Sequence, residues 1–322
     1  MLPSIRPRAL ALAPLICLAC ASVKPGGAAT NDAAGNDAAA PADAVQDLGG
    51  QDTAAPVDRV SFDFGSPAER PPPAPGKVYA HSDSTLWLLE PISKQMTMVG
   101  AFDCVSAGDV ASMVDIAIDR AGKMTGSAGI SFNMSLGGAL VSIDPTNAHC
   151  TILNRGANLV TSLTYVPEGT LLAGAEALVG YAEDRYVRVD PATGAVTDIG
   201  PLNNAASGGT TWVSSGDVVS IKDGGTYLTV KPETGSTAGG DRIVEVDPKT
   251  GALKRIIGAT GMVDVLGLGY WGGIAYGFTI AGTLIQIDLR TGAGTVIPIP
   301  GATSELSFLG AGTTTIAPII VE

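Results

Sequence analysis

The stretch Ile243-Val244-Glu245-Val246-Asp247-Pro248-Lys249-Thr250-Gly251 is a short alternating strand that runs directly into a turn. The turn has an explicit chemistry, because an Asp side chain accepts the N–H group two residues on, Pro fixes φ and Gly tolerates a positive φ. Four similar copies centre on Glu90, Asp144, Asp190 and Asp288, so the five acidic positions lie 41 to 57 residues apart. A repeat of this length is typical of a β-propeller blade.

Each repeat contains two hairpins. A further strand follows every Asp-containing turn, and a second hairpin precedes it. The first strands of these preceding hairpins are expected at 116–119, 163–166, 218–221, 266–269 and 306–309, and the second strands follow at 122–124, 169–171, 225–227, 273–275 and 312–314. In the turn at Asp144, we expect Asn147 near the position that Gly occupies elsewhere, because Asn tolerates left-handed φ better than most residues.

The ends of the repeat array are incomplete in complementary ways. The first unit lacks its first strand, and the last unit lacks its third and fourth strands. Circular closure reconciles them if a strand at 305–309 joins the blade that contains 86–90 and 96–99, and closure also removes exposed sheet edges. Both 78–82 and 313–316 could supply the second strand of that blade. We therefore predict an all-β propeller of five four-stranded blades over residues 77–322.

The strand followed by Asp-Pro-x-Thr-Gly resembles the repeats of bacterial secreted propellers of the YVTN and NHL-like superfamily, and the resemblance covers residues 77–322. It implies the propeller fold. It leaves the function open, because such propellers include binding modules, scaffolds and a few enzymes.

The amino terminus has the pattern of an export signal. Arg6 and Arg8 precede an apolar run at 9–19 that is too short to span a bilayer. The run ends in Cys17-Leu18-Ala19-Cys20, which resembles a bacterial lipobox and implies lipid attachment at Cys20. The absence of an acid at Ala21 implies an outer-membrane destination. Ordinary signal cleavage, which would leave a secreted or periplasmic protein, is the alternative.

Residues 20–76 are rich in Ala, Pro and Asp, a composition that cannot bury enough apolar surface to fold. We expect a disordered linker between a signal peptide at 1–19 and the propeller. The formal net charge of −12 argues against nucleic-acid binding and against electrostatic adhesion to anionic lipid. Membrane contact is therefore expected through the lipid anchor only.

Catalytic and redox candidates are few. The two histidines, His81 and His149, are expected at different places on the disc, and neither builds a zinc site or a Ser-His-Asp arrangement. A disulfide between Cys104 and Cys150 is chemically allowed in an exported domain. The repeat alignment, however, puts them on opposite faces of a regular propeller, so their pairing stays open at this point.

Acidic residues gather where innermost strands begin. The alignment places Asp115, Asp217 and Glu305 around one mouth of the central tunnel, with Asp264 one position before the aligned residue. Converging carboxylates repel one another unless a hard cation such as Ca²⁺ or a basic ligand group neutralises them. The alternative is a set of solvated strand ends.

Three functions fit these observations. The leading hypothesis is a monomeric, lipid-anchored propeller of the cell envelope that binds an envelope or extracellular protein, or a glycan, and catalyses nothing. The main alternative is a propeller lyase or hydrolase that uses His81 or His149 with a tunnel carboxylate. The third is a structural spacer whose faces bind nothing specific.

Overall fold

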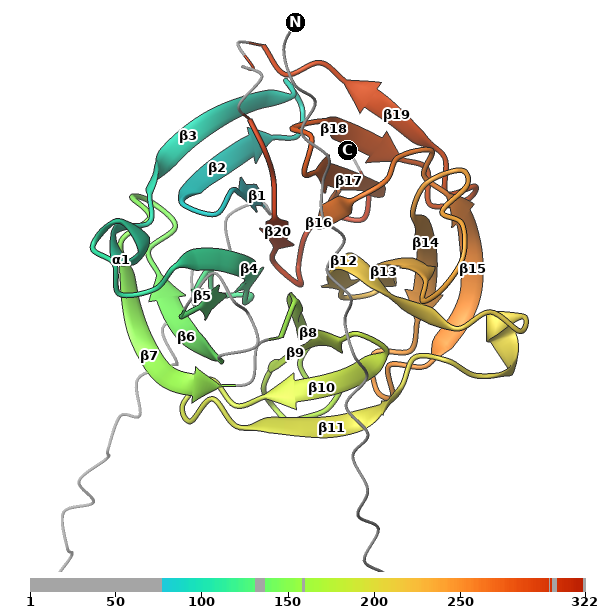
Figure 1. Cartoon of the computed structure of the whole chain (residues 1–322), viewed down its shortest axis with the longest axis horizontal. Coiled ribbons are helices and arrows are strands. Elements are labelled where there is room, and N and C mark those ends of the chain that lie inside the picture. Colours follow the sequence, from blue (N-terminus) through green and yellow to red (C-terminus); the bar gives the residue numbers. More distant parts are fainter. Residues whose placement is uncertain (1–76, 131–136, 158–159, 301, 303–305, 321–322) are drawn as a thin grey trace, which may run out of the picture. The chain divides into compact units, whose positions relative to one another are not determined.

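The computed structural model describes residues 77–130, 137–157, 160–300, 302 and 306–320. Its strands form five four-stranded antiparallel sheets around one axis (Figure 1), which confirms the predicted five-bladed propeller. The helices of the described residues are single turns, α1 (Asp103–Ser106) and a 3-10 turn (Ala205–Ser207). No helix among them is long and apolar enough to cross a membrane.

Each blade runs from an innermost strand at the axis to an outermost strand at the rim. The first contains β20 (Gly310–Thr313), β1 (Val78–His81), β2 (Thr85–Glu90) and β3 (Gln95–Ala101). The second contains β4 (Ser112–Ile118), β5 (Met124–Gly129), β6 (Gly138–Ile143) and β7 (Cys150–Ala157). The third contains β8 (Ser162–Val166), β9 (Ala177–Ala182), β10 (Arg185–Val189) and β11 (Val196–Pro201). The fourth contains β12 (Trp212–Ile221), β13 (Gly225–Pro232), β14 (Arg242–Val246) and β15 (Leu253–Ala259). The fifth contains β16 (Val265–Trp271), β17 (Ile274–Thr279), β18 (Leu284–Ile287) and β19 (Gly294–Ile297).

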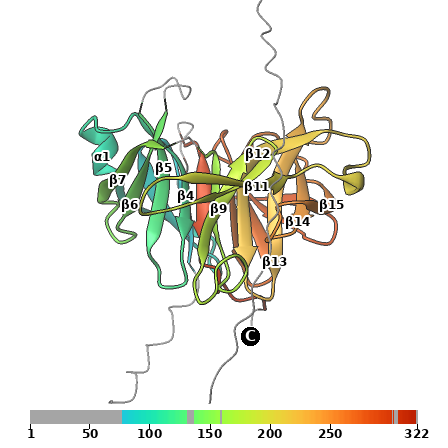
Figure 2. The same cartoon turned by 90° about the horizontal axis from the view of Figure 1, so that it is seen from below.

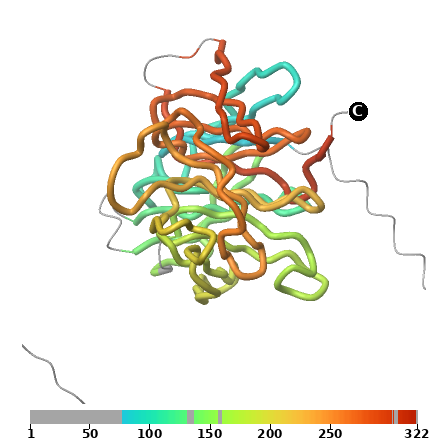
Figure 3. The backbone as a smooth tube through the Cα atoms, turned by 90° about the vertical axis from the view of Figure 1, so that its right-hand side faces the viewer, coloured from blue at the N-terminus to red at the C-terminus, as the bar shows by residue number. Residues whose placement is uncertain are grey.

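The two ends of the array meet in the first blade. Strand β1 pairs with β2 on one side and with β20 on the other, in the register Val78 to Thr313 and His81 to Gly310. Figure 3 shows this closure as red chain lying beside cyan chain. Residues 78–81 therefore supply the second strand of this blade. The inner strand begins at Gly310, so its expected position at 305–309 was wrong.

The third blade departs from the predicted repeat. Its second strand is β9 (Ala177–Ala182), and the expected strand at 169–171 was wrong. Ten residues, 167–176, join β8 to β9, whereas only 119–123, 222–224 and 272–273 join the equivalent strands of the second, fourth and fifth blades. The sequence pattern failed here because an insertion follows the first strand.

The Asp-containing turns have the expected chemistry. In all five, the acidic side chain accepts the main-chain N–H group two residues on, at 2.7 to 3.2 Å. Gly194, Gly251 and Gly292 have φ values of 71°, 71° and 79°. In the turn at Asp144, Ala148 has the left-handed conformation at φ 64°, so the expectation for Asn147 was one residue off.

Hydrophobic packing joins each blade to both of its neighbours. Five buried clusters each draw side chains from two neighbouring blades, so one lies at every interface between blades. The cluster that closes the ring packs Phe278 and Phe308 at 5.3 Å, edge to face, together with Val78 and Leu89 from the first blade. Because each blade buries apolar surface against both neighbours, the fold depends on a closed ring.

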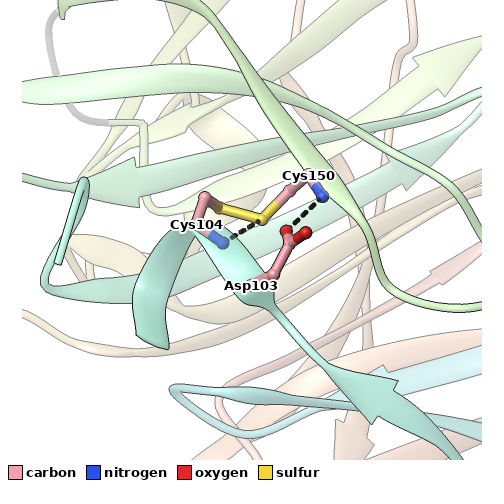
Figure 4. A group of neighbouring side chains, drawn as sticks. All are labelled: Asp103, Cys104 and Cys150. Atoms are coloured by element: carbon pink, nitrogen blue, oxygen red, sulfur yellow. Dashed lines mark hydrogen bonds between the residues drawn. A yellow bond between two sulfur atoms is a disulfide. The ribbon is translucent and has the colours of Figure 1, made fainter. Parts of the chain in front are cut away.

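Cys104 and Cys150 form a disulfide that joins the first two blades, with their Cα atoms 5.6 Å apart. The Asp103 carboxylate next to it accepts the main-chain N–H of Cys150 at 2.8 Å (Figure 4). The objection that these cysteines lie on opposite faces was wrong. The blades twist until their outermost strands run along the rim (Figure 1), so the chain leaving β3 approaches the start of β7.

We predict that the Cys104→Ser, Cys150→Ser variant loses about 4 kcal/mol of unfolding free energy, because the bond closes a long loop in the unfolded chain. Urea unfolding of both proteins measures the loss. Alkylation of the unreduced, denatured full chain, followed by peptide mapping, should leave both cysteines unlabelled. Full labelling at both would contradict the bond.

Candidate functional site

The innermost strands of the five blades turn one edge toward the axis. A sheet edge presents main-chain N–H groups that have no partner within the sheet, and buried N–H groups need acceptors. Five inner edges converge in this fold, so the axis requires several acceptors in a small volume.

Two buried aspartates supply these acceptors. Asp115 on β4 and Asp217 on β12 are 1% and 0% exposed. Asp115 accepts the N–H groups of Ile116 on β4, at 2.8 Å, and Leu163 on β8. Asp217 accepts those of Val218, Leu268 and Ala311, on β12, β16 and β20, at 2.6, 3.0 and 3.2 Å. The two side chains therefore bind one N–H group from every blade.

The two carboxyl groups lie close enough for each to influence the pKa of the other. Burial raises the pKa of Asp115 well above its usual range. Burial, followed by repulsion from Asp115, does the same to the pKa of Asp217. Two adjacent carboxylates in a dry site cannot both ionise without a large cost, so the pair holds a proton between them. That proton and the five N–H groups stabilise the pair.

His81 lies beside this pair. Its Nδ1 is 2.7 Å from the carbonyl oxygen of Ser82, which can only accept, so Nδ1 carries the hydrogen. Burial lowers the pKa of His81 to about 4, which keeps the ring neutral at pH 7. Its Nε2 lies 3.9 Å from Oδ1 of Asp115 and has no hydrogen-bond partner among the described residues. Residue 310 is a glycine beside Nε2 of His81 and Oδ1 of Asp115, because the β-carbon of any other residue there would overlap with both of these atoms.

The other predicted site residues do not join the pair. Asp264 is exposed just before β16. Glu305 lies outside the described residues. His149 is exposed at the rim and pairs with Asp103. The alignment therefore found Asp115 and Asp217, but gave no sign of His81 as their neighbour. Binding of Ca²⁺ by the four acids stays a prediction.

The sole cluster of three potential metal ligands in the described parts of the chain is Asp103, Cys104 and Cys150. Its two sulfur atoms are bonded to each other, which leaves one carboxylate. The cluster is therefore a disulfide site.

A pocket of about 340 Å³, which we call the mouth pocket, opens where the inner strands begin. Every blade contributes to its lining. The lining comprises Ser112, Met113, Val114, Thr161, Ser214, Ser215, Gly216, Lys231, Leu266 and Leu309. Val114 and Gly216 directly precede the two buried aspartates, so the pair lies next to the pocket floor.

Irregular pairing shapes this floor. The register between first and second strands shifts at Val114 in β4, between Ser214 and Val218 in β12, and at Leu266 in β16. Such bulges turn side chains toward positions that a regular ladder cannot reach, and they are frequent next to functional sites. Here the bulged residues line the pocket while the following aspartates point into the axis.

The mouth pocket is largely aliphatic, with hydroxyl groups and one ionisable side chain, Lys231. The Ser215 hydroxyl is buried. Asp241 lies close enough to Lys231 for the ammonium to oppose the rise in its pKa that burial causes. The pocket can therefore hold an apolar group and offer it polar contacts.

Comparison with known proteins identifies a repeat rather than a function. Residues 162–315, just under half of the chain, match the family model of a repeat of unknown function, DUF6923. No curated protein matches the chain.

Solved structures match as well, 457 chains in all. BamB from Moraxella catarrhalis is 14% identical, with 69% of this chain and 58% of that chain covered and a TM-score of 0.32. An oligogalacturonate lyase in complex with manganese is 10% identical, with 69% and 61% covered and a TM-score of 0.35. The chain thus spans about six tenths of the length of these two structures.

We predict that the carboxyl pair makes the protein less stable as the pH rises. The pair keeps a proton in the folded state that the unfolded chain releases near pH 4, so stability falls between that pH and the raised folded pKa. Asp217→Asn removes one carboxyl and its repulsion, and the fall from pH 5 to pH 9 should become shallower.

Urea unfolding between pH 5 and pH 9 measures how steeply the unfolding free energy falls with pH in the wild type and in Asp217→Asn. Any contribution of His81 that is common to the two proteins cancels when the two slopes are subtracted. Asp223→Asn, at an exposed position in the β12–β13 turn that is in none of the ion pairs among the described residues, is the control and should keep the wild-type dependence of stability on pH. Equal slopes in the wild type and Asp217→Asn would contradict the shared proton.

Proposed function

We propose that this protein is a bacterial lipoprotein whose propeller, of the YVTN and NHL-like kind, binds a protein of the cell envelope at the mouth pocket. The observation that carries the proposal is the lining of that pocket, to which all five blades contribute and in which three bulged strands project side chains. A volume of about 340 Å³ is within the range of ligand pockets.

The chemistry of the lining favours an apolar side chain of a partner protein over a glycan. Met113, Val114, Leu266 and Leu309 are aliphatic, and the lining has no aromatic side chain on which a sugar ring could stack. The ammonium of Lys231 can fix the orientation of the inserted group through a hydrogen bond.

Accessibility favours binding over the lyase or hydrolase alternative. His81, Asp115 and Asp217 are at most 1% exposed, so a substrate in the pocket does not reach them in this conformation. His149 is solvent-exposed but pairs with Asp103 at the rim, beside the disulfide. Lys231, the ionisable group of the lining, has no acid-base partner among the lining residues.

The sequence supports the envelope assignment. Arg6, Arg8 and the apolar run at 9–19 are typical of an export signal, and Cys20 follows Leu18-Ala19 as in a lipobox. Lipid chains on Cys20 would hold the protein at a membrane, and Ala21 favours the outer membrane. The acidic Ala- and Pro-rich stretch at 20–76 would then separate the propeller from its anchor.

We predict that a photoreactive amino acid at Thr161, on the wall of the mouth pocket, crosslinks the full chain to a defined envelope protein in intact bacterial cells. The control is the same substitution at Thr197, an exposed position on β11 at the rim. A discrete adduct at position 161 that is missing at 197 is the expected result. Equal labelling at both positions, or none at 161, would favour the spacer.

We predict that cells fed radioactive palmitate label the full chain at Cys20. Cys20→Ser should abolish the label and release the protein from the membrane fraction, because the net charge of −12 disfavours electrostatic adhesion to anionic lipid. Cys17→Ser is the matched control and should keep both. Wild-type protein that carries no radioactive palmitate and lies in the soluble fraction would indicate ordinary signal cleavage.

A further inference from the structure

The insertion at 167–176 walls two adjoining cavities on the face opposite the mouth pocket, where the inner strands end. Their volumes are about 530 and 500 Å³, and both are lined by Arg120, Glu168, Gly174 and Glu176. We call them together the insertion pocket. Figure 2 shows this face at its lower side, on the side of the C-terminus. An insertion in one repeat often builds a binding surface, because the sheet itself does not need it.

Three separate parts of the chain meet at Glu176. Its carboxylate accepts the main-chain N–H of Arg120, in the β4–β5 turn, at 2.7 Å, and it accepts the hydroxyl of Thr315, in the segment after β20. These contacts fix the walls of the insertion pocket. Burial raises the pKa of the half-buried Glu176, while the two hydrogen bonds oppose that rise.

Charges of both signs face this pocket. Arg120 pairs with Glu168, and both side chains are nearly half exposed, so each keeps free hydrogen-bonding positions toward solvent. Lys222 also lines the pocket, and none of the ion pairs among the described residues includes it. A positive part, Lys222 and Arg120, thus lies beside a negative part, to which Asp119 contributes together with Glu168 and Glu176.

We propose that the insertion pocket binds a small zwitterion of the amino-acid or short-peptide class. Its carboxylate would contact Lys222 and Arg120, and its ammonium group would contact Glu168 and Glu176. A ligand of one sign would meet repulsion from the groups of that sign, whereas a zwitterion gains charge-assisted hydrogen bonds from both the positive and the negative part. This site is on the other face from the mouth pocket and does not depend on the function proposed there.

The test is a thermal melt of the full chain with 5 mM of each of the twenty common L-amino acids and of L-alanyl-L-alanine. At least one should raise the melting temperature, because a ligand of the native state stabilises it. N-acetyl-L-alanine N-methylamide, which has the same backbone without charges, should not. Calorimetric titration then gives the Kd of the zwitterion that shifts the melt.

Lys222→Met and Glu168→Gln should each weaken that binding about tenfold or more. Both positions are exposed, so the variants should melt like the wild type without ligand. The matched controls are Lys249→Met and Glu233→Gln, which are exposed and outside the pocket. The proposal is overturned if no zwitterion shifts the melt, if the blocked analogue binds equally well, or if both pocket variants bind like the controls.

Discussion

The hydrogen bonding of the Asp115 and Asp217 carboxyl groups to five inward N–H groups is the interaction on which the rest of the structure depends. A propeller places the inner edges of its sheets face to face, and each edge exposes N–H groups that are costly to bury without acceptors. Here two side chains accept one main-chain N–H group from each of the five blades. Their own burial is tolerable because they share a proton and accept these groups.

This interaction also connects closure of the ring to its centre. Ala311, whose N–H group binds Asp217, lies on β20, the strand that completes the first blade from the carboxyl-terminal end. The preceding residue, Gly310, leaves room for His81 and Asp115. Breaking the axial contacts would therefore weaken the pairing between the two ends of the chain, in addition to the centre of the disc.

The repeat made most of the fold predictable. The third and fourth strands of every blade and their turns follow from the Asp-Pro-x-Thr-Gly pattern, since each turn is stabilised by local side-chain chemistry. Four of the five inner strands were also predicted, at 116–119, 163–166, 218–221 and 266–269. Two strands were misplaced: β20 begins later than expected, since its position is set by pairing with β1 from the other end of the chain, and the ten-residue insertion displaced β9.

The candidate site was predictable only in part. Alignment placed Asp115 and Asp217 at the same level, and they do meet. It could not show that the bulges at Val114 and around Gly216 direct them inward, or that the aligned region of the fifth blade leaves Asp264 in solvent. The disulfide was uncertain for a similar reason, because the twist of a blade, which brings Cys104 near Cys150, is a property of the whole sheet.

Two faces of one disc then offer different chemistry. The mouth pocket is aliphatic, and its shape follows from the same bulges that direct the aspartates into the axis. The insertion pocket is charged and owes its walls to a single departure from the repeat. A closed ring held at its axis can carry both, because loops on either face vary without disturbing the inner strands.

Amide hydrogen exchange in the wild type and Asp217→Ala tests the central claim most directly. The account predicts that Val218, Leu268 and Ala311, in three different blades, lose about tenfold or more of their protection together, because they share one acceptor. Amides between the middle strands β13 and β14 should stay protected. Wild-type exchange rates at all three positions would contradict the account, because the inner edges would then be held without the carboxyl pair.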